Sequence, residues 1–159
     1  MTTSYRTSNS VMTWLTCAAL LAGAACSGGS DAGSDGERQP IRTSELEAGD
    51  CFETGDPTPP IEWVTPVACA GPHTNEVYDH FKFKEEQWLG EDAVQAAMVN
   101  RCQSTFAEFV GTPYTSSTYL IQFFLPTEET WAEGDREGVC FLLFETVEPA
   151  IGSARDSGR

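Results

Sequence analysis

Basic side chains are scarce in this 159-residue chain. Nine Lys and Arg stand against 24 Asp and Glu, which gives a formal net charge of −15 at pH 7. Nucleic-acid binding depends on clustered Lys and Arg that replace the counterions of the phosphate backbone. We therefore expect no nucleic-acid partner. The acidity is typical of a solvated surface that keeps an exported protein soluble.

The sequence also lacks an apolar run long enough for a bilayer-spanning helix. Its longest candidate, residues 11–25, has about 15 residues, whereas a spanning helix needs roughly 20. Arg6 precedes this run and small residues end it, which is the pattern of an export signal. We predict a signal peptide over residues 1–26, and Cys17 lies within the discarded part.

The apolar run ends in LLAGAAC, and the polar stretch SGGSDAGSDGE follows Cys26 directly. A bacterial lipoprotein signal has this order, although Gly23 stands where such signals usually have Leu. We expect lipidation of Cys26, which places the protein at the outer face of the cell membrane. The alternatives are cleavage near Ala24 or Ala25, which gives a secreted protein, and an uncleaved anchor. Residues 27–42 lack apolar periodicity and are predicted to form a flexible polar tether.

Beyond the signal, no two cysteines are close in sequence. Cys51, Cys69, Cys102 and Cys140 are separated by 18, 33 and 38 residues. Zinc-finger sites use close cysteine pairs, so we expect no metal and no cofactor. An even number of cysteines in an exported domain indicates two disulfides, and oxidised cysteines supply no thiolate nucleophile.

Residues 88–111 have the apolar periodicity of one helix face. The recurring residues are Val94, Met98, Cys102, Phe106 and Phe109 or Val110. Gly111 and then Pro113 are predicted to end the helix. Because Cys102 lies on the buried face, its partner should lie on the sheet that the helix covers. We predict the pairs Cys102–Cys140 and Cys51–Cys69, and the other two pairings remain alternatives.

Four segments have strand patterns: residues 61–68, 76–83, 118–125 and 139–147. The predicted fold is α+β, a small mainly antiparallel sheet with one main helix packed on one face and two disulfides. Its domain spans residues 43–152, and residues 153–159 form a loose polar tail. We expect Thr127 to cap a short helical turn, and Trp63, Trp88 and Trp131 to be partly buried with bonded indole N–H groups.

Several short motifs punctuate this domain. They are GDCF at 49–52, V-x-C-x-x-P-H-x-x-E-V-Y at 67–78, PT at 126–127, Trp131, GDR at 134–136 and VC at 139–140. With the cysteine order and the exported architecture, they resemble the septum formation family domain of actinobacterial exported and membrane-anchored proteins, over about residues 44–152. The resemblance implies a process, septum formation in cell division, with no established catalytic residues, cofactor or ligand.

His73, Glu76 and Tyr78 lie in the longest of these motifs and are candidate binding residues. Pro72 stiffens the turn before His73, and Glu76 is placed to accept from a ring N–H. A held imidazole beside a carboxylate is a general base or a metal ligand. The alternative role is structural, in which His73 caps a turn beside a disulfide.

Arg136 is the fourth candidate binding residue, because it is one of few basic groups in an acidic domain. Its guanidinium could grip a carboxylate on a ligand. The alternative is an ion pair within the chain, for example with Asp50 in the GDC turn.

These observations favour a non-catalytic, membrane-tethered binding or scaffold module with a protein or cell-wall partner, and not an enzyme. Two alternatives remain. One is an exported enzyme that uses His73 with Glu76 as acid and base. The other is a small secreted inhibitor that presents the proline-rich loop at residues 54–60.

Overall fold

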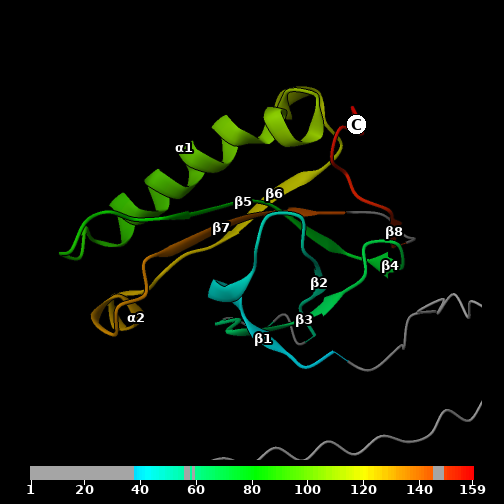
Figure 1. Cartoon of the computed structure of the whole chain (residues 1–159). Helices are drawn as coiled ribbons and strands as arrows, with labels where there is room; N and C mark the ends of the chain where they lie inside the picture. Colours follow the sequence, from blue (N-terminus) through cyan, green and yellow to red (C-terminus); the bar gives the residue numbers. More distant parts are fainter. Residues whose placement is uncertain (1–37, 56–57, 59, 145–148) are drawn as a thin grey trace, which may run out of the picture. The chain divides into compact units, whose positions relative to one another are not determined.

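The computed structural model describes residues 38–55, 58, 60–144 and 149–159 (Figure 1). The predicted signal peptide, the predicted lipidation site Cys26, residues 27–37 of the predicted tether and part of the proline-rich loop lie outside these residues. Among the described residues, no helix combines the length and the apolar character that crossing a membrane requires.

A six-stranded sheet forms the centre of the domain, and its neighbouring strands pair antiparallel. Its order is β1 (Ile41–Arg42), β3 (Trp63–Val67), β2 (Cys51–Glu53), β5 (Asn75–Lys82), β7 (Glu137–Leu143) and β6 (Leu120–Phe124). A separate pair joins β4 (Pro72–His73) to β8 (Ala150–Ile151). The four predicted strands are present. Strands β3 and β6 are shorter than expected, and β5 has the expected length but begins one residue earlier. Strand β7 begins two residues earlier and ends at Leu143, and residues 145–147 of that prediction lie outside the described residues. Strands β1, β2, β4 and β8 have only two or three residues. Such short strands cannot be recognised from an alternating sequence pattern.

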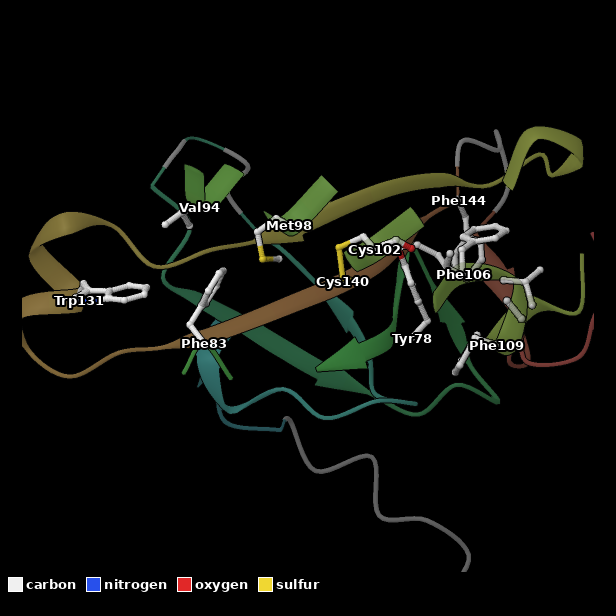
Figure 2. Packing of buried hydrophobic residues seen from close by; sticks show 13 residues of the cluster. Tyr78, Phe83, Val94, Met98, Cys102, Phe106, Phe109, Trp131, Cys140 and Phe144 are labelled. Atoms are coloured by element: carbon white, nitrogen blue, oxygen red, sulfur yellow. Dashed lines mark hydrogen bonds between the residues drawn. A yellow bond between two sulfur atoms is a disulfide. The ribbon is translucent and has the colours of Figure 1, made fainter. Parts of the chain in front are cut away.

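Helix α1 (Glu91–Val110) covers one face of the sheet, as predicted (Figure 1). It begins after Gly90, at φ 89°, and ends at Gly111, whose left-handed conformation lets its N–H donate to the carbonyl of Ala107. The residues buried between α1 and the sheet form the first core cluster (Figure 2). They are Tyr78, Phe83, Val94, Met98, Cys102, Phe106, Phe109, Val110, Trp131, Cys140, Leu142, Phe144 and Ala154.

Both predicted disulfides are present. Cys102 on α1 is bonded to Cys140 on β7, and both sulfurs lie inside the first core cluster (Figure 2). Cys51 on β2 is bonded to Cys69, which follows β3. Each bridge typically contributes about 2 to 4 kcal/mol, which matters in a domain of this size.

The other face of the sheet carries a second core cluster of Leu46, Phe52, Val64, Val77, Val139 and Phe141. The alternation along β7 explains the division, since Val139 and Phe141 face this cluster whereas Cys140 and Leu142 face α1. Leu46 follows the 3₁₀ turn η1 (Thr43–Glu45) and is fully buried.

The N-terminal border of the fold differs from the expectation. Residues 27–42 were predicted to be a tether, yet Ile41 and Arg42 pair with Val64 and Trp63 of β3. Trp63 is more exposed than Trp88 and Trp131. It is 49% exposed at the short end of the sheet, and the Arg42 guanidinium lies 4.8 Å from the centre of its ring.

Helix α2 (Glu128–Ala132) is capped by Thr127, whose hydroxyl accepts from the N–H of Thr130, as predicted. The indole N–H of Trp131 donates to the carbonyl of Glu86 at 3.1 Å, and Trp88 packs edge-on against the same ring. The region between residues 85 and 88 is thereby joined to α2. Between α1 and β6, the chain forms the 3₁₀ turn η2 (Tyr114–Ser116).

The C-terminal residues are bound to the domain, which corrects the expectation of a loose tail. Gly152 donates its N–H to the carbonyl of Cys69, and Asp156 and Gly158 donate theirs to Phe109 and Val110 at the end of α1. Ala154 is 2% exposed. We call residues 150–158 the C-terminal strap.

Candidate functional site

His73 is fully buried, and its contacts differ from the prediction. Its Nδ1 lies 2.9 Å from the carbonyl of Gly71, and its ring packs edge-on against Phe144. Because a carbonyl oxygen can only accept, Nδ1 carries the proton. Nε2 has no hydrogen-bond partner among the described residues. The turn-capping alternative therefore describes His73, whose imidazole faces the protein interior.

Glu76 is also fully buried, but its carboxylate does not accept from His73 as predicted. Its two oxygens accept from the hydroxyl of Ser153 and from the N–H of Ala154, the latter at 2.7 Å. The reason is the C-terminal strap, which fills the space beside Glu76 and supplies donors that the sequence pattern did not indicate. The carboxylate thus holds the strap against β5.

The carboxylate of Glu76 lies beside the disulfide Cys51–Cys69. One ligand atom from each of these three residues lies within 4.8 Å of the others. Thiolates and a carboxylate are zinc ligands, but here the two sulfurs are bonded to each other. This group could hold a metal ion only after reduction of the disulfide.

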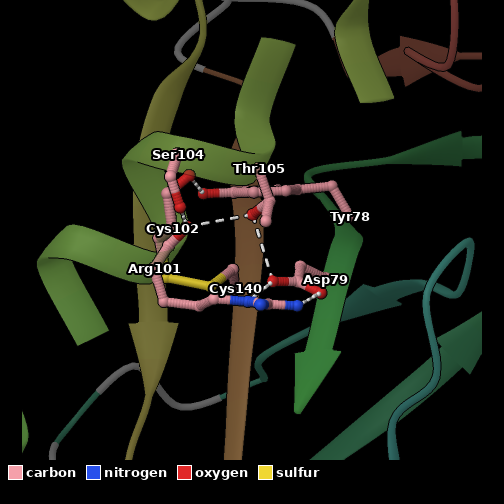
Figure 3. Close-up of polar contacts among 7 residues, drawn as sticks. All are labelled: Tyr78, Asp79, Arg101, Cys102, Ser104, Thr105 and Cys140. Carbon is pink, nitrogen blue, oxygen red and sulfur yellow. Dashed lines mark hydrogen bonds and ion pairs between the residues drawn. A yellow bond between two sulfur atoms is a disulfide. The ribbon is translucent and has the colours of Figure 1, made fainter. Parts of the chain in front are cut away.

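Tyr78 occupies a β-bulge, since the register of β5 against β7 shifts between Val77 and Asp79. The extra residue lets both Tyr78 and Asp79 contact α1 (Figure 3). The Tyr78 hydroxyl donates to the carbonyl of Cys102 at 2.8 Å. Burial raises the pKa of Tyr78 strongly, and the neighbouring charge of Asp79 raises it further. Tyr78 is thus a neutral internal donor.

Asp79 forms a second contact between β5 and α1, which is more exposed than the Tyr78 contact (Figure 3). Arg101 donates to both oxygens of its carboxylate, at 2.6 and 3.2 Å, and Thr105 donates to it at 3.0 Å. The hydrogen bond to Asp79 raises the pKa of Arg101. A hollow of about 300 Å³ borders this group, lined by Ala48, Tyr78, Asp79, Arg101, Thr105, Glu108, Phe109 and Arg155.

Arg136 does not pair with Asp50, whose side chain instead accepts from the N–H of Glu47 at 2.8 Å. The Arg136 guanidinium donates to four backbone carbonyls, those of Glu85, Glu86, Trp131 and Asp135, at 2.6 to 3.1 Å. It also lies 4.0 Å from the centre of the Trp131 ring. The guanidinium reaches all four carbonyls because it carries five N–H donors in a planar arrangement. The carbonyls of Glu86 and Trp131 each accept a second hydrogen bond, from the indole N–H of Trp131 and the N–H of Gly134. The role of Arg136 is to fix α2 against residues 85–86.

The structure therefore does not bring the four predicted residues into one open site. His73 and Glu76 face the interior beside a disulfide, Tyr78 bonds to α1, and Arg136 is bound by carbonyls of its own chain.

The larger hollow lies elsewhere, between the N-terminal border of the sheet and α2. It measures about 450 Å³, and we call it the α2 groove. It is lined by Arg42, Thr43, Ser44, Pro60, Ile61, Glu62, Leu125, Thr127, Glu129, Thr130, Glu133 and Asp135. Ile61 and Leu125 supply apolar surface, and four of the lining residues are acidic against one arginine. The sequence reasoning missed this groove because its two walls are more than sixty residues apart, and Arg42 was assigned to the tether.

The family motifs acquire a role in this geometry. Thr127 of the PT motif caps α2, Trp131 anchors it to residue 86, and Arg136 of the GDR motif fixes both. These residues position one wall of the α2 groove.

A family model described as Septum formation matches residues 13–140 of the chain. The match begins earlier and ends earlier than the 44–152 expected from the motifs, and it includes most of the apolar run of the predicted signal. No curated protein and no solved structure matches the chain. Because the family model covers well over half of the 159 residues, the chain belongs to the Septum formation family.

Proposed function

We propose that this chain is a non-catalytic, exported binding or scaffold module of septum formation, tethered to the membrane by a lipid on Cys26. Membership of the Septum formation family supports the process. The two disulfides support export, because such bonds persist in oxidising compartments outside the cytoplasm. The order of apolar run, small residues, Cys26 and polar stretch supports the lipid anchor.

The observation that carries the binding role is the α2 groove. Trp131 and Arg136, which belong to the family motifs, hold one wall of this groove in place. Glu76, which was the candidate acid, is instead bonded inside the protein. A concave surface with apolar and polar lining is the usual form of a ligand site. The partner is a protein or cell-wall segment that fits this groove. Its acidic lining favours positively charged groups on that segment.

The groove is tested by placing a photo-cross-linkable residue at Glu133, which is exposed on its rim, in the full chain expressed in cells. The matched control carries the same residue at Gln95, exposed on α1 and away from the groove. We expect a covalent adduct with a specific envelope component at position 133 and none at 95. Equal adducts at both positions, or none at either, would contradict a groove-based binding role.

Localisation and the lipid are tested separately. A fluorescent fusion of the full chain should concentrate at the division septum, and mass spectrometry of the mature protein should show an acylated N-terminal Cys26. The Cys26→Ser variant should leave the membrane fraction. An even distribution of the fusion around dividing cells would contradict the septal role, and a mature chain that starts elsewhere would remove the anchor.

A further inference from the structure

Strand β6 lies at the border of the sheet, and β7 is its only strand neighbour among the described residues. In an edge strand, alternate backbone N–H and C=O groups point away from the sheet without a ladder partner. Natural edges are usually protected by charged side chains, proline or a bulge. The sequence of β6 is Leu-Ile-Gln-Phe-Phe, its register with β7 is unbroken, and it has none of these protections.

The sequence on both sides of β6 is also uncharged. Residues 109–127 contain no acidic or basic side chain, although the whole chain carries a net charge of −15. Four of the five β6 side chains are apolar and only partly buried, and Gln122 is exposed. Ile121 and Phe123 lie on the α1 face, whereas Phe124 packs with Phe141 on the other.

The sequence of β6 is complementary to itself when it is reversed about Gln122. In an antiparallel pair of two β6 strands centred there, Leu120 of one copy faces Phe124 of the other, and Ile121 faces Phe123. Each apolar side chain thus meets an apolar side chain, and such aliphatic–aromatic cross-strand pairs are favourable. Gln122 faces its own copy, and its amide can both donate and accept.

We propose that β6 pairs with β6 of a second copy of this chain, antiparallel and about a two-fold axis at Gln122. The pairing satisfies the open edge and makes one continuous sheet from two protomers, in an isologous interface. The axis is perpendicular to the sheet, so both α1 helices lie on the same face. Two chains of net charge −15 repel each other. The segment that contains β6 has no charged side chain, so this repulsion is weakest for a contact made through β6.

Cysteine cross-linking of the full chain in membranes tests both the pairing and its register. Opposed residues have Cα atoms about 4.5 to 5.5 Å apart, within the roughly 7 Å limit for a disulfide. The Gln122→Cys variant should therefore form a cross-linked dimer by itself. In this register Leu120 faces Phe124 of the other copy. The two Leu120 Cα atoms are therefore offset by four residues along the strand, which is about 13 Å. Leu120→Cys alone and Phe124→Cys alone should not cross-link, but a mixture of the two variants should.

A charge variant tests the same contact without added thiols. Gln122→Glu places two carboxylates opposite each other at the axis and should weaken the dimer roughly fivefold or more, measured by sedimentation of the full chain in detergent. Gln95→Glu adds the same charge on the exposed side of α1 and should leave the dimer unchanged.

The proposal is overturned if Gln122→Cys forms no cross-link, or if Leu120→Cys cross-links to itself as readily. Capture of a different protein by Gln122→Cys would assign the edge to a partner strand and equally overturn it. None of these readouts depends on septal localisation, so the two proposals fail independently.

Discussion

The carboxylate of Glu76 accepts a hydrogen bond from the backbone N–H of Ala154, 78 residues later in the chain, at 2.7 Å. Both residues are almost completely buried. This contact joins the central strand β5 to the C-terminal strap, and the hydroxyl of Ser153 donates to the same carboxylate. A residue that has the sequence context of a catalytic acid is thus the attachment point of a chain end.

Glu76→Gln should loosen the strap. The amide keeps the shape of the side chain but loses one acceptor oxygen and the charge, and hydrogen bonds to charged groups contribute about 1.5 to 3 kcal/mol each. We expect a loss of about that size in the free energy of unfolding by urea, with faster amide exchange in residues 150–158. Glu47→Gln, at an exposed position, is the control. Unchanged exchange in the strap would contradict the role assigned to Glu76.

Arg136→Lys should destabilise the contact between α2 and residues 85–86. One ammonium has three donors and no planar face, so it cannot reach four carbonyls and stack on Trp131. We expect a stability loss of about 1 to 3 kcal/mol, because several carbonyls lose a hydrogen bond from a charged donor. The fluorescence of Trp131 should change as well. Lys82→Arg, at an exposed position, is the control. An Arg136→Lys variant as stable as the original would contradict the role of Arg136 in fixing α2 against residues 85–86.

Tyr78 should make the domain sensitive to alkali. Its pKa is raised in the folded state, so the folded protein keeps the phenol neutral while the unfolded chain ionises near pH 10. The stabilisation is complete below pH 10 and is lost as the pH rises above it, because the unfolded state then releases the proton. Stability measured from pH 8 to 11 should fall more steeply in the original protein than in Tyr78→Phe. Parallel curves for the two proteins would contradict this assignment.

The two disulfides should differ in their reaction with a mild reductant. Cys102 and Cys140 are both 0% exposed, whereas Cys69 is partly exposed beside a buried Cys51. A dithiol reaches a disulfide only through an accessible sulfur, so Cys51–Cys69 should open first. Alkylation of partly reduced protein, followed by peptide mass mapping, would show which cysteines react. Equal labelling of all four cysteines without unfolding would contradict this order.

Local sequence patterns predicted much of the fold. The recurrence of Val94, Met98, Cys102 and Phe106 marked the buried face of α1, and Gly111 marked its end. Because Cys102 lies on that buried face, its partner was expected on the sheet, and the structure pairs it with Cys140 of β7. These features depend on helical and strand periodicity, which a single segment contains in full.

The candidate site was harder to predict, because its contacts cross long separations. Glu76 was paired with a histidine three residues away, whereas its donors come from residues 153 and 154. Arg136 was assigned to a carboxylate, whereas it binds carbonyls near residue 85 and in α2. Backbone carbonyls have no signature in a sequence, so such a partner becomes visible only when the chain is folded.

The amino-acid sequence by itself determined the class of fold, the two disulfides, the shortage of positive charge and the family, because each depends on local periodicity, composition or short motifs. Only the tertiary structure decided that His73 and Glu76 face inward, that the strap is bound, and that β6 has β7 as its one strand neighbour among the described residues. The physical reason is that a side chain's role is set by which groups reach it. Those groups come from segments that only long-range packing brings together.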